Sequence, residues 1–177
     1  MSGDIVKGYS APIAVNGYDH MKKKNGMWRI LKRAEQKYGY EGLYKIMQKN
    51  WRFILPMIKD NQTNVDNLID VFTVRTMTEF YFDKPFDLSP KVFLLWFLRG
   101  LIPKNKPNLK LDALGKQVTK QMYAYIDSTP WAKKVLPGIL KEDGRGADTL
   151  KGEALQLAFI FSVFSLRSGL SSTIPYF

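Results

Sequence analysis

Few side chains in this sequence have the types and spacing that catalysis requires. The chain has one histidine, His20, and no cysteine, which excludes a thiolate nucleophile, a cysteine-based zinc site and a pair of histidine ligands. A Ser-His-Asp triad would have to use His20. This residue stands in a polar, lysine-rich stretch, so we interpret it as a solvated surface histidine.

Two pairs of carboxylates are the remaining candidates for acid–base chemistry. Asp66 and Asp70 are four residues apart on a predicted helix, and Asp83 and Asp87 stand on either side of Pro85. General acid catalysis needs one carboxyl group buried enough to raise its pKa. Asp66 and Asp70 lie off the apolar stripe of their helix, and we expect both to be solvated. The sequence therefore predicts no enzyme: no catalytic residue, no metal, no cofactor and no small-molecule substrate.

Glycine-containing segments do not match phosphate-binding loops. Gly115 precedes Lys116, but Lys110 stands where the loop needs its first glycine and Gln117 where it needs Ser or Thr. The segment 144–146 has no third glycine and follows no predicted strand. A surface loop is the simpler interpretation there.

Positive charge is the strongest chemical feature of the chain. Lys and Arg number 27 against 16 Asp and Glu, a formal net charge of +11. Between residues 22 and 37, only Glu35 opposes a dense basic cluster. Such a helix face attracts the phosphates of nucleic acid or anionic lipid, and the alternative is an ordinary solvated face. The predicted polyanion-binding residues are Lys22, Lys23, Lys24, Arg29, Lys32, Arg33 and Lys37.

Two helical segments carry more apolar surface than one small core needs. Residues 92–98 are apolar nearly all round, and residues 155–166 contain no charge. Twelve residues are short for a bilayer span, and a longer segment would include Arg167, at a cost of about 2.5–3.5 kcal/mol at a helix centre. A buried helix, a subunit interface and a membrane-surface contact all remain open. The predicted partner interface comprises Phe93, Trp96, Phe97, Phe159, Phe161 and Phe164, with Ile174, Tyr176 and Phe177 of an aromatic tail.

Apolar periodicity predicts helices along most of the chain. Residues 1–25 show no helical period and predict an extended arm. Helices are expected over 27–38, ended by Gly39, over 41–59 with a kink at Pro56, and from 65 to about 82 after an Asn64 cap. The apolar side of the second helix is predicted to consist of Leu43, Met47, Trp51, Ile54 and Ile58. The β-branched and aromatic stretch 71–82 leaves a strand as the alternative.

Helix-start signals order the second half of the chain. Ser89-Pro90 and Thr129-Pro130 each place a cap before a proline, the pattern of a helix start. They predict one helix to about residue 99 and a short one ended near Pro137-Gly138. Further helices are expected over 111–126 and, after a charged loop over 141–147, over 149–168, capped by Asp148 and ended by Gly169.

These features predict an all-α fold: an irregular domain of six or seven helices over 26–177, with the N-terminal arm over 1–25 and a docked C-terminal tail. The chain shows no secretory signal. We expect a non-catalytic structural or accessory subunit of a large multi-subunit assembly at or against a membrane, with protein subunits and anionic lipid as partners. The mitochondrial inner-membrane periphery is favoured over a virion or the cytoplasm. The alternative is a nucleic-acid-binding structural protein, such as a ribosomal or nucleocapsid component.

Overall fold

Helices build the fold of this chain. The structure, a computed structural model, describes residues 4–6, 9–10, 17–58, 65–87, 89, 92, 109–144 and 146–173. The helices are α1 (Gly17–Ile58), α2 (Val65–Phe82), α4 (Leu109–Asp127), α5 (Pro130–Lys134), α6 (Leu136–Asp143), α7 (Ala147–Gln156) and α8 (Val163–Thr173). Two short strands, β1 (Asp4–Val6) and β2 (Tyr9–Ser10), pair antiparallel with each other before α1. The predicted all-α fold is confirmed.

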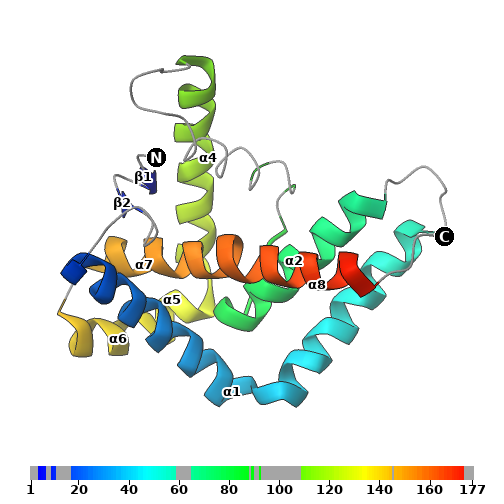
Figure 1. Cartoon of the computed structure of the whole chain (residues 1–177), viewed down its shortest axis with the longest axis horizontal. Coiled ribbons are helices and arrows are strands. Elements are labelled where there is room, and N and C mark those ends of the chain that lie inside the picture. Colours follow the sequence, from blue (N-terminus) through cyan, green and yellow to red (C-terminus); the bar gives the residue numbers. More distant parts are fainter. Residues whose placement is uncertain are drawn as a thin grey trace.

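A continuous rod lies across the centre of the molecule. It consists of α7, the π-helical segment η2 (Leu157–Ser162) and α8, and it packs against α2 (Figure 1). Leu150, Leu155 and Phe159 of the rod are fully buried, together with Phe82 at the end of α2. Helix α1 runs along the lower edge of this view as an open V and covers α2 (Figure 1). The core therefore lies between α1, α2 and the rod, and the outer side of α1 faces away from it.

Helix α1 is longer than the sequence pattern predicts. It begins at Gly17 rather than near Met27, so residues 17–25 are helical and the predicted extended arm over 1–25 is wrong for this part. Met and Lys are strong helix formers, and their intrinsic preference extends the helix where no apolar period marks it. The break in helical backbone angles falls at Gly39, with φ 57° and ψ −165°, and not at Pro56.

Helix α2 resolves the choice between helix and strand over 71–82. The whole stretch is helical, so the strand alternative is wrong. The Thr73 hydroxyl donates to the Asp70 carbonyl (3.1 Å), and the Thr78 hydroxyl donates to the Val74 carbonyl (2.7 Å). These bonds satisfy β-branched polar side chains inside a buried helix, so burial against α1 and the rod overrides their strand preference.

In the second half of the chain, local signals predicted some helix boundaries and missed others. The Thr129 cap is confirmed, since its hydroxyl accepts from the Ala132 N–H (3.2 Å), and the helix predicted over 111–126 is α4. The short helix predicted to start at Thr129-Pro130 is α5, which ends at Lys134, just before the predicted stop near Pro137-Gly138. The sequence pattern missed α6, which runs through Gly138 and is followed by Gly144 at φ 69°. The loop expected over 141–147 is correspondingly shorter.

The rod departs from the prediction at both ends. Its N-cap is Gly146, not Asp148, and it runs through Gly169 to Thr173. The helix predicted to follow Ser89-Pro90 lies, apart from Val92, outside the described residues. There the Val92 N–H donates to the Ser89 carbonyl (2.9 Å).

Candidate functional site on helix α1

The first half of α1, residues 17–38, buries one side and exposes the other. Met27, Ile30 and Ala34 recur at spacings of three and four residues and lie in the core. On the outer side, Tyr18, Met21 and Trp28 are 58–71% exposed. Side chains of this size are seldom left in water without a reason when several share one helix face.

Cations surround these exposed side chains. The Lys22 ammonium lies 4.2 Å from the centroid of the Tyr18 ring, a cation–π contact. Further exposed cations follow along the same helix. We define the basic–aromatic face as Tyr18, Met21, Lys22, Lys24, Trp28, Arg29 and Lys32.

Arg33 and Lys37, both predicted to bind polyanions, form ion pairs within the chain. The Arg33 guanidinium lies 2.7 Å from a Glu142 carboxylate oxygen, and the Lys37 ammonium lies 2.5 Å from one of Asp83. Their charge is partly neutralised, and they attach α1 to α6 and to the end of α2. Lys23 is half-buried, while Lys22, Lys24, Arg29 and Lys32 are exposed. His20, expected on a solvated surface, is half-buried.

Asp83 joins the bend of α1 to the end of α2. It has a positive φ of 61°, and its N–H donates to the Glu79 carbonyl (2.9 Å), which ends α2. Its carboxylate accepts a hydrogen bond from the Tyr38 hydroxyl, next to Gly39. Burial, followed by this bond and the Asp83 charge, raises the pKa of Tyr38 above its usual 10.0. Tyr38 therefore stays a neutral donor, and Asp83 binds the two residues that directly precede the bend, Lys37 and Tyr38.

The second half of α1, residues 40–58, exposes a continuous apolar edge. Ile46, Asn50 and Ile54 repeat every four residues and are buried. The neighbouring edge is 40–85% exposed. We define this apolar stripe as Tyr40, Tyr44, Trp51, Leu55 and Ile58, whose spacings of four, seven, four and three residues place them on one side of a helix.

A polar network fixes the buried side of this half-helix. Buried Asn50 donates to a Glu79 carboxylate oxygen (3.0 Å) and accepts from the Arg75 guanidinium (3.2 Å). The Lys49 ammonium lies 2.6 Å from the other Glu79 oxygen, and Arg75 also donates to Asp87. The bonds of Asn50 and Lys49 cross from α1 to α2 and set which side of α1 faces water.

The predicted partner interface is mostly outside the described residues. Phe159 is fully buried in this chain's own core, in edge-to-face contact with Phe86 (5.0 Å between ring centroids), so its assignment to a partner interface was wrong. Packing of α2 and α4 around the rod encloses it. Phe161 and Phe164 belong to η2 and α8, but their side chains lie outside the described set. The other predicted interface residues, Phe93, Trp96, Phe97, Ile174, Tyr176 and Phe177, fall outside it altogether.

Both carboxylate pairs form ion pairs with basic side chains. The Arg167 guanidinium lies 2.8 Å from Asp70 and 3.8 Å from Asp66, which attaches α8 to α2. Burial raises the pKa of Asp70, and Arg167 opposes that rise. Asp70 is therefore partly buried, whereas the sequence pattern predicts that it is solvated. Among the described residues, no three His, Asp or Glu side chains form a group suited to a metal ion.

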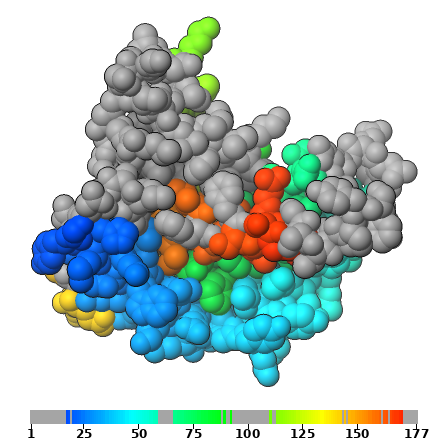
Figure 2. Space-filling model, viewed as in Figure 1, coloured from blue at the N-terminus to red at the C-terminus, as the bar shows by residue number. Residues whose placement is uncertain are grey.

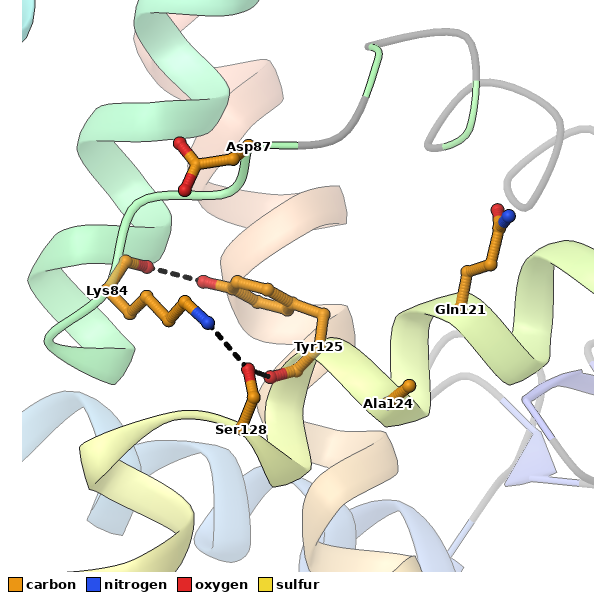
Figure 3. Close-up of a pocket in the computed structure, with 6 residues that line it drawn as sticks. All are labelled: Lys84, Asp87, Gln121, Ala124, Tyr125 and Ser128. Carbon is orange, nitrogen blue, oxygen red and sulfur yellow. Dashed lines mark hydrogen bonds between the residues drawn. The ribbon is translucent and has the colours of Figure 1, made fainter.

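A pocket of about 290 Å³ opens between the segment after α2 and helix α4 (Figure 3). The Lys84 ammonium donates to the Ser128 hydroxyl (2.8 Å), which donates to the Tyr125 carbonyl (2.6 Å). An activated serine would instead give its proton to a base. The Tyr125 hydroxyl donates to the Lys84 carbonyl (2.5 Å) and closes the arrangement. These bonds attach the segment after α2 to the end of α4, and the sequence analysis had no signal for them.

One described helix is long and apolar enough to cross a membrane by length and composition alone. It is Ala147–Leu170, within the rod, and 62% of its most apolar window is buried inside the molecule. A central core helix passes the same test.

Comparison with protein-family models, with curated proteins and with solved structures found no match to this chain.

Proposed function

We propose that the protein is a non-catalytic structural or accessory subunit of a larger assembly, and that α1 places it against an anionic membrane surface. The supporting observation is the basic–aromatic face, where Tyr18, Met21 and Trp28 are exposed among four exposed cations. Helices that lie on membranes combine Lys and Arg with Trp and other large apolar side chains, and Trp and Tyr favour the headgroup level. The location at a mitochondrial inner membrane stays a prediction from the sequence.

The energies are large enough for reversible binding. Each Lys or Arg near an anionic surface contributes about 1 kcal/mol. Four such residues therefore contribute about 4 kcal/mol, or roughly a thousandfold in partitioning. Because this attraction is electrostatic, it weakens as salt shortens the Debye length.

Single-stranded nucleic acid is the second candidate for the same face. Exposed Trp28 and Tyr18 offer flat rings on which bases stack, and the neighbouring cations suit phosphates. Lysine outnumbers arginine in this cluster, which favours general phosphate attraction over base readout.

Matched charge variants test the proposal. Replacing Lys22, Lys24, Arg29 and Lys32 with Gln removes four charges from the face. The control replaces Lys110, Lys120, Lys133 and Lys141 with Gln, four exposed lysines outside α1. Co-sedimentation with phosphatidylcholine vesicles, with and without phosphatidylserine, measures binding. We expect the face variant to lose about a hundred- to a thousandfold in affinity for anionic vesicles, and the control to lose less.

Equal losses in the two variants would mean that net charge alone attracts the protein, and would overturn the proposal. The same would follow if the wild-type chain bound no anionic vesicle. If the wild type binds a single-stranded RNA oligonucleotide but no vesicle, and the face variant loses that binding, the nucleic-acid candidate replaces the membrane one.

A further inference from the structure

We infer that the apolar stripe on the second half of α1 inserts below the headgroups of the anionic membrane to which the basic–aromatic face binds. This inference rests on the proposed function and adds an apolar contact to an electrostatic one. The stripe extends over residues 40–58, about 27 Å at 1.5 Å per residue. It is long enough to lie flat on a bilayer over its whole length.

The stripe is held outward by the fold. Ile46, Asn50 and Ile54 on the adjoining side are buried, and Asn50 is bonded to both Glu79 and Arg75. Rotation of this half-helix to hide the stripe would break these contacts. Trp51 makes an edge-to-face contact with Phe72, at 5.7 Å between centroids, and is 47% exposed. Its remaining surface stays available.

The composition of the stripe favours a membrane over a second copy of the chain. Two Tyr and one Trp are the residues that favour the headgroup level, and Leu55 and Ile58 supply aliphatic area. Lys45 and Arg52 are exposed on the neighbouring side of the same half-helix. In an antiparallel pair of stripes, residues on the same flank of the two helices meet, so Lys45 of one copy would face Arg52 of the other. An anionic lipid surface accepts both cations without this repulsion.

The bend at Gly39 is compatible with one flat surface. Two straight helix axes that meet at a bend lie in a single plane, and one bilayer contacts both halves of α1 where their exposed faces turn to the same side of that plane. Figure 1 shows α1 as an open V along one border of the molecule, and Figure 2 shows its atoms, from blue to cyan, at the surface. The first half of α1 then supplies positive charge, and the second half supplies apolar side chains that enter the bilayer below the headgroups.

Trp51 is a natural reporter of depth. In the full-length chain, replacing Trp28 and Trp96 with Phe leaves Trp51 and Trp131, and Trp131 is buried. Vesicles of phosphatidylserine and phosphatidylcholine brominated in the acyl chains quench a tryptophan only when it approaches the bromine atoms. We expect bound protein to show strong quenching, and no such quenching when Trp51 is also replaced with Phe.

A second pair of variants measures the apolar contribution. Leu55→Gln combined with Ile58→Gln should lower vesicle affinity about ten- to a hundredfold, because two aliphatic side chains no longer leave water. Leu114→Gln, at an exposed leucine of α4, is the control and should bind like the wild type. Circular dichroism melting checks that each variant is folded.

The outcomes separate the two proposals. Binding without quenching of Trp51 overturns the insertion and leaves the surface-binding function standing. Absence of wild-type binding overturns the function itself. If the wild-type chain self-associates in solution and the stripe variant does not, insertion of the stripe is also overturned. The same follows if Leu114→Gln loses as much vesicle affinity as the stripe variant.

Discussion

Tyr125 shows how a single side chain connects three parts of this fold. Its hydroxyl donates to the Lys84 carbonyl (2.5 Å), and its ring lies edge-on to Phe86, at 4.9 Å between centroids, and to Phe159. Burial raises the pKa of Tyr125 above its usual 10.0. The neutral phenol is therefore the form that the folded state requires.

Replacing Tyr125 with Phe should lower the free energy of unfolding by about 1 kcal/mol near neutral pH, because the Lys84 carbonyl loses its donor. The pH dependence has a definite sign. Since the folded-state pKa is the higher one, the contribution of Tyr125 is complete below about pH 10 and is lost as the pH rises further. The wild type should lose stability above that pH more steeply than the variant. Urea titrations on either side of pH 10 measure both slopes, and parallel slopes would contradict the assignment.

The helix-capping role of Thr129 is predictable from its sequence neighbours, and substitutions of this residue test it. Its hydroxyl accepts from the Ala132 N–H and donates to the Ile126 carbonyl (2.6 Å). Thr129→Ala should destabilise the protein by about 1 kcal/mol in urea unfolding, while Thr129→Ser, which keeps the hydroxyl, should restore most of the loss. A serine variant as unstable as the alanine variant would show that the methyl group, not the cap, matters.

At the scale of elements, glycine has two opposite roles in this chain. Gly39 has φ 57° and interrupts α1, whereas Gly169 lies inside α8. Neither position would bring an added Cβ within 4 Å of another atom, so differences between substitutions there reflect backbone conformation and not crowding.

Gly39→Ala should therefore destabilise the fold by about 1–3 kcal/mol, because the combination of φ 57° and ψ −165° is essentially restricted to glycine. Gly169→Ala should stabilise it by roughly 0.5–1 kcal/mol, because alanine has the higher helix propensity. Urea unfolding of the two variants measures the difference in sign. If both changed stability in the same direction, the bend at Gly39 would not depend on its left-handed conformation.

Helix boundaries that depend on local interactions were predictable from the sequence, and those that depend on tertiary contacts were not. The Thr129 cap and the break at Gly39 are local, since backbone geometry and neighbouring residues decide them. Gly169 did not end the rod, because α8 packs on α2 and Arg167 pairs with Asp70, contacts that join residues far apart in the sequence. Such tertiary contacts override weak local propensity.

At the scale of the whole molecule, one part of the candidate site was predictable from the sequence and another part was not. The run of cations on α1 was visible in the sequence, but the sequence did not show which of these cations pair with acidic side chains of the same chain. Arg33 is neutralised by Glu142, 109 residues away, which no local pattern reveals. The apolar stripe was also hidden, because only the position of α2 shows that Trp51 and Ile58 stay outside while Ile54 is buried.

Net charge gives a prediction for the molecule as a whole. The chain carries +11, and cations on the first half of α1 are exposed to water. Like charges over a compact surface repel and lower stability. Raising salt shortens the Debye length from about 30 Å at 0.01 M to about 8 Å at 0.15 M, which screens distant repulsion more than the ion pairs in contact. The melting temperature should therefore rise with salt, by about 2–4 °C for each kcal/mol of repulsion removed.

The variant with Gln at positions 22, 24, 29 and 32 makes this prediction sharper. Its formal charge falls by four, from +11 to +7, so it should be more stable than the wild type at low salt and gain less from added salt. The same variant should bind anionic vesicles more weakly, so stability and binding would change in opposite directions. Thermal unfolding at the two salt concentrations measures the effect. A wild-type melting temperature that falls with salt would show that ion pairs such as Arg167–Asp70 outweigh the repulsion among the cations of α1.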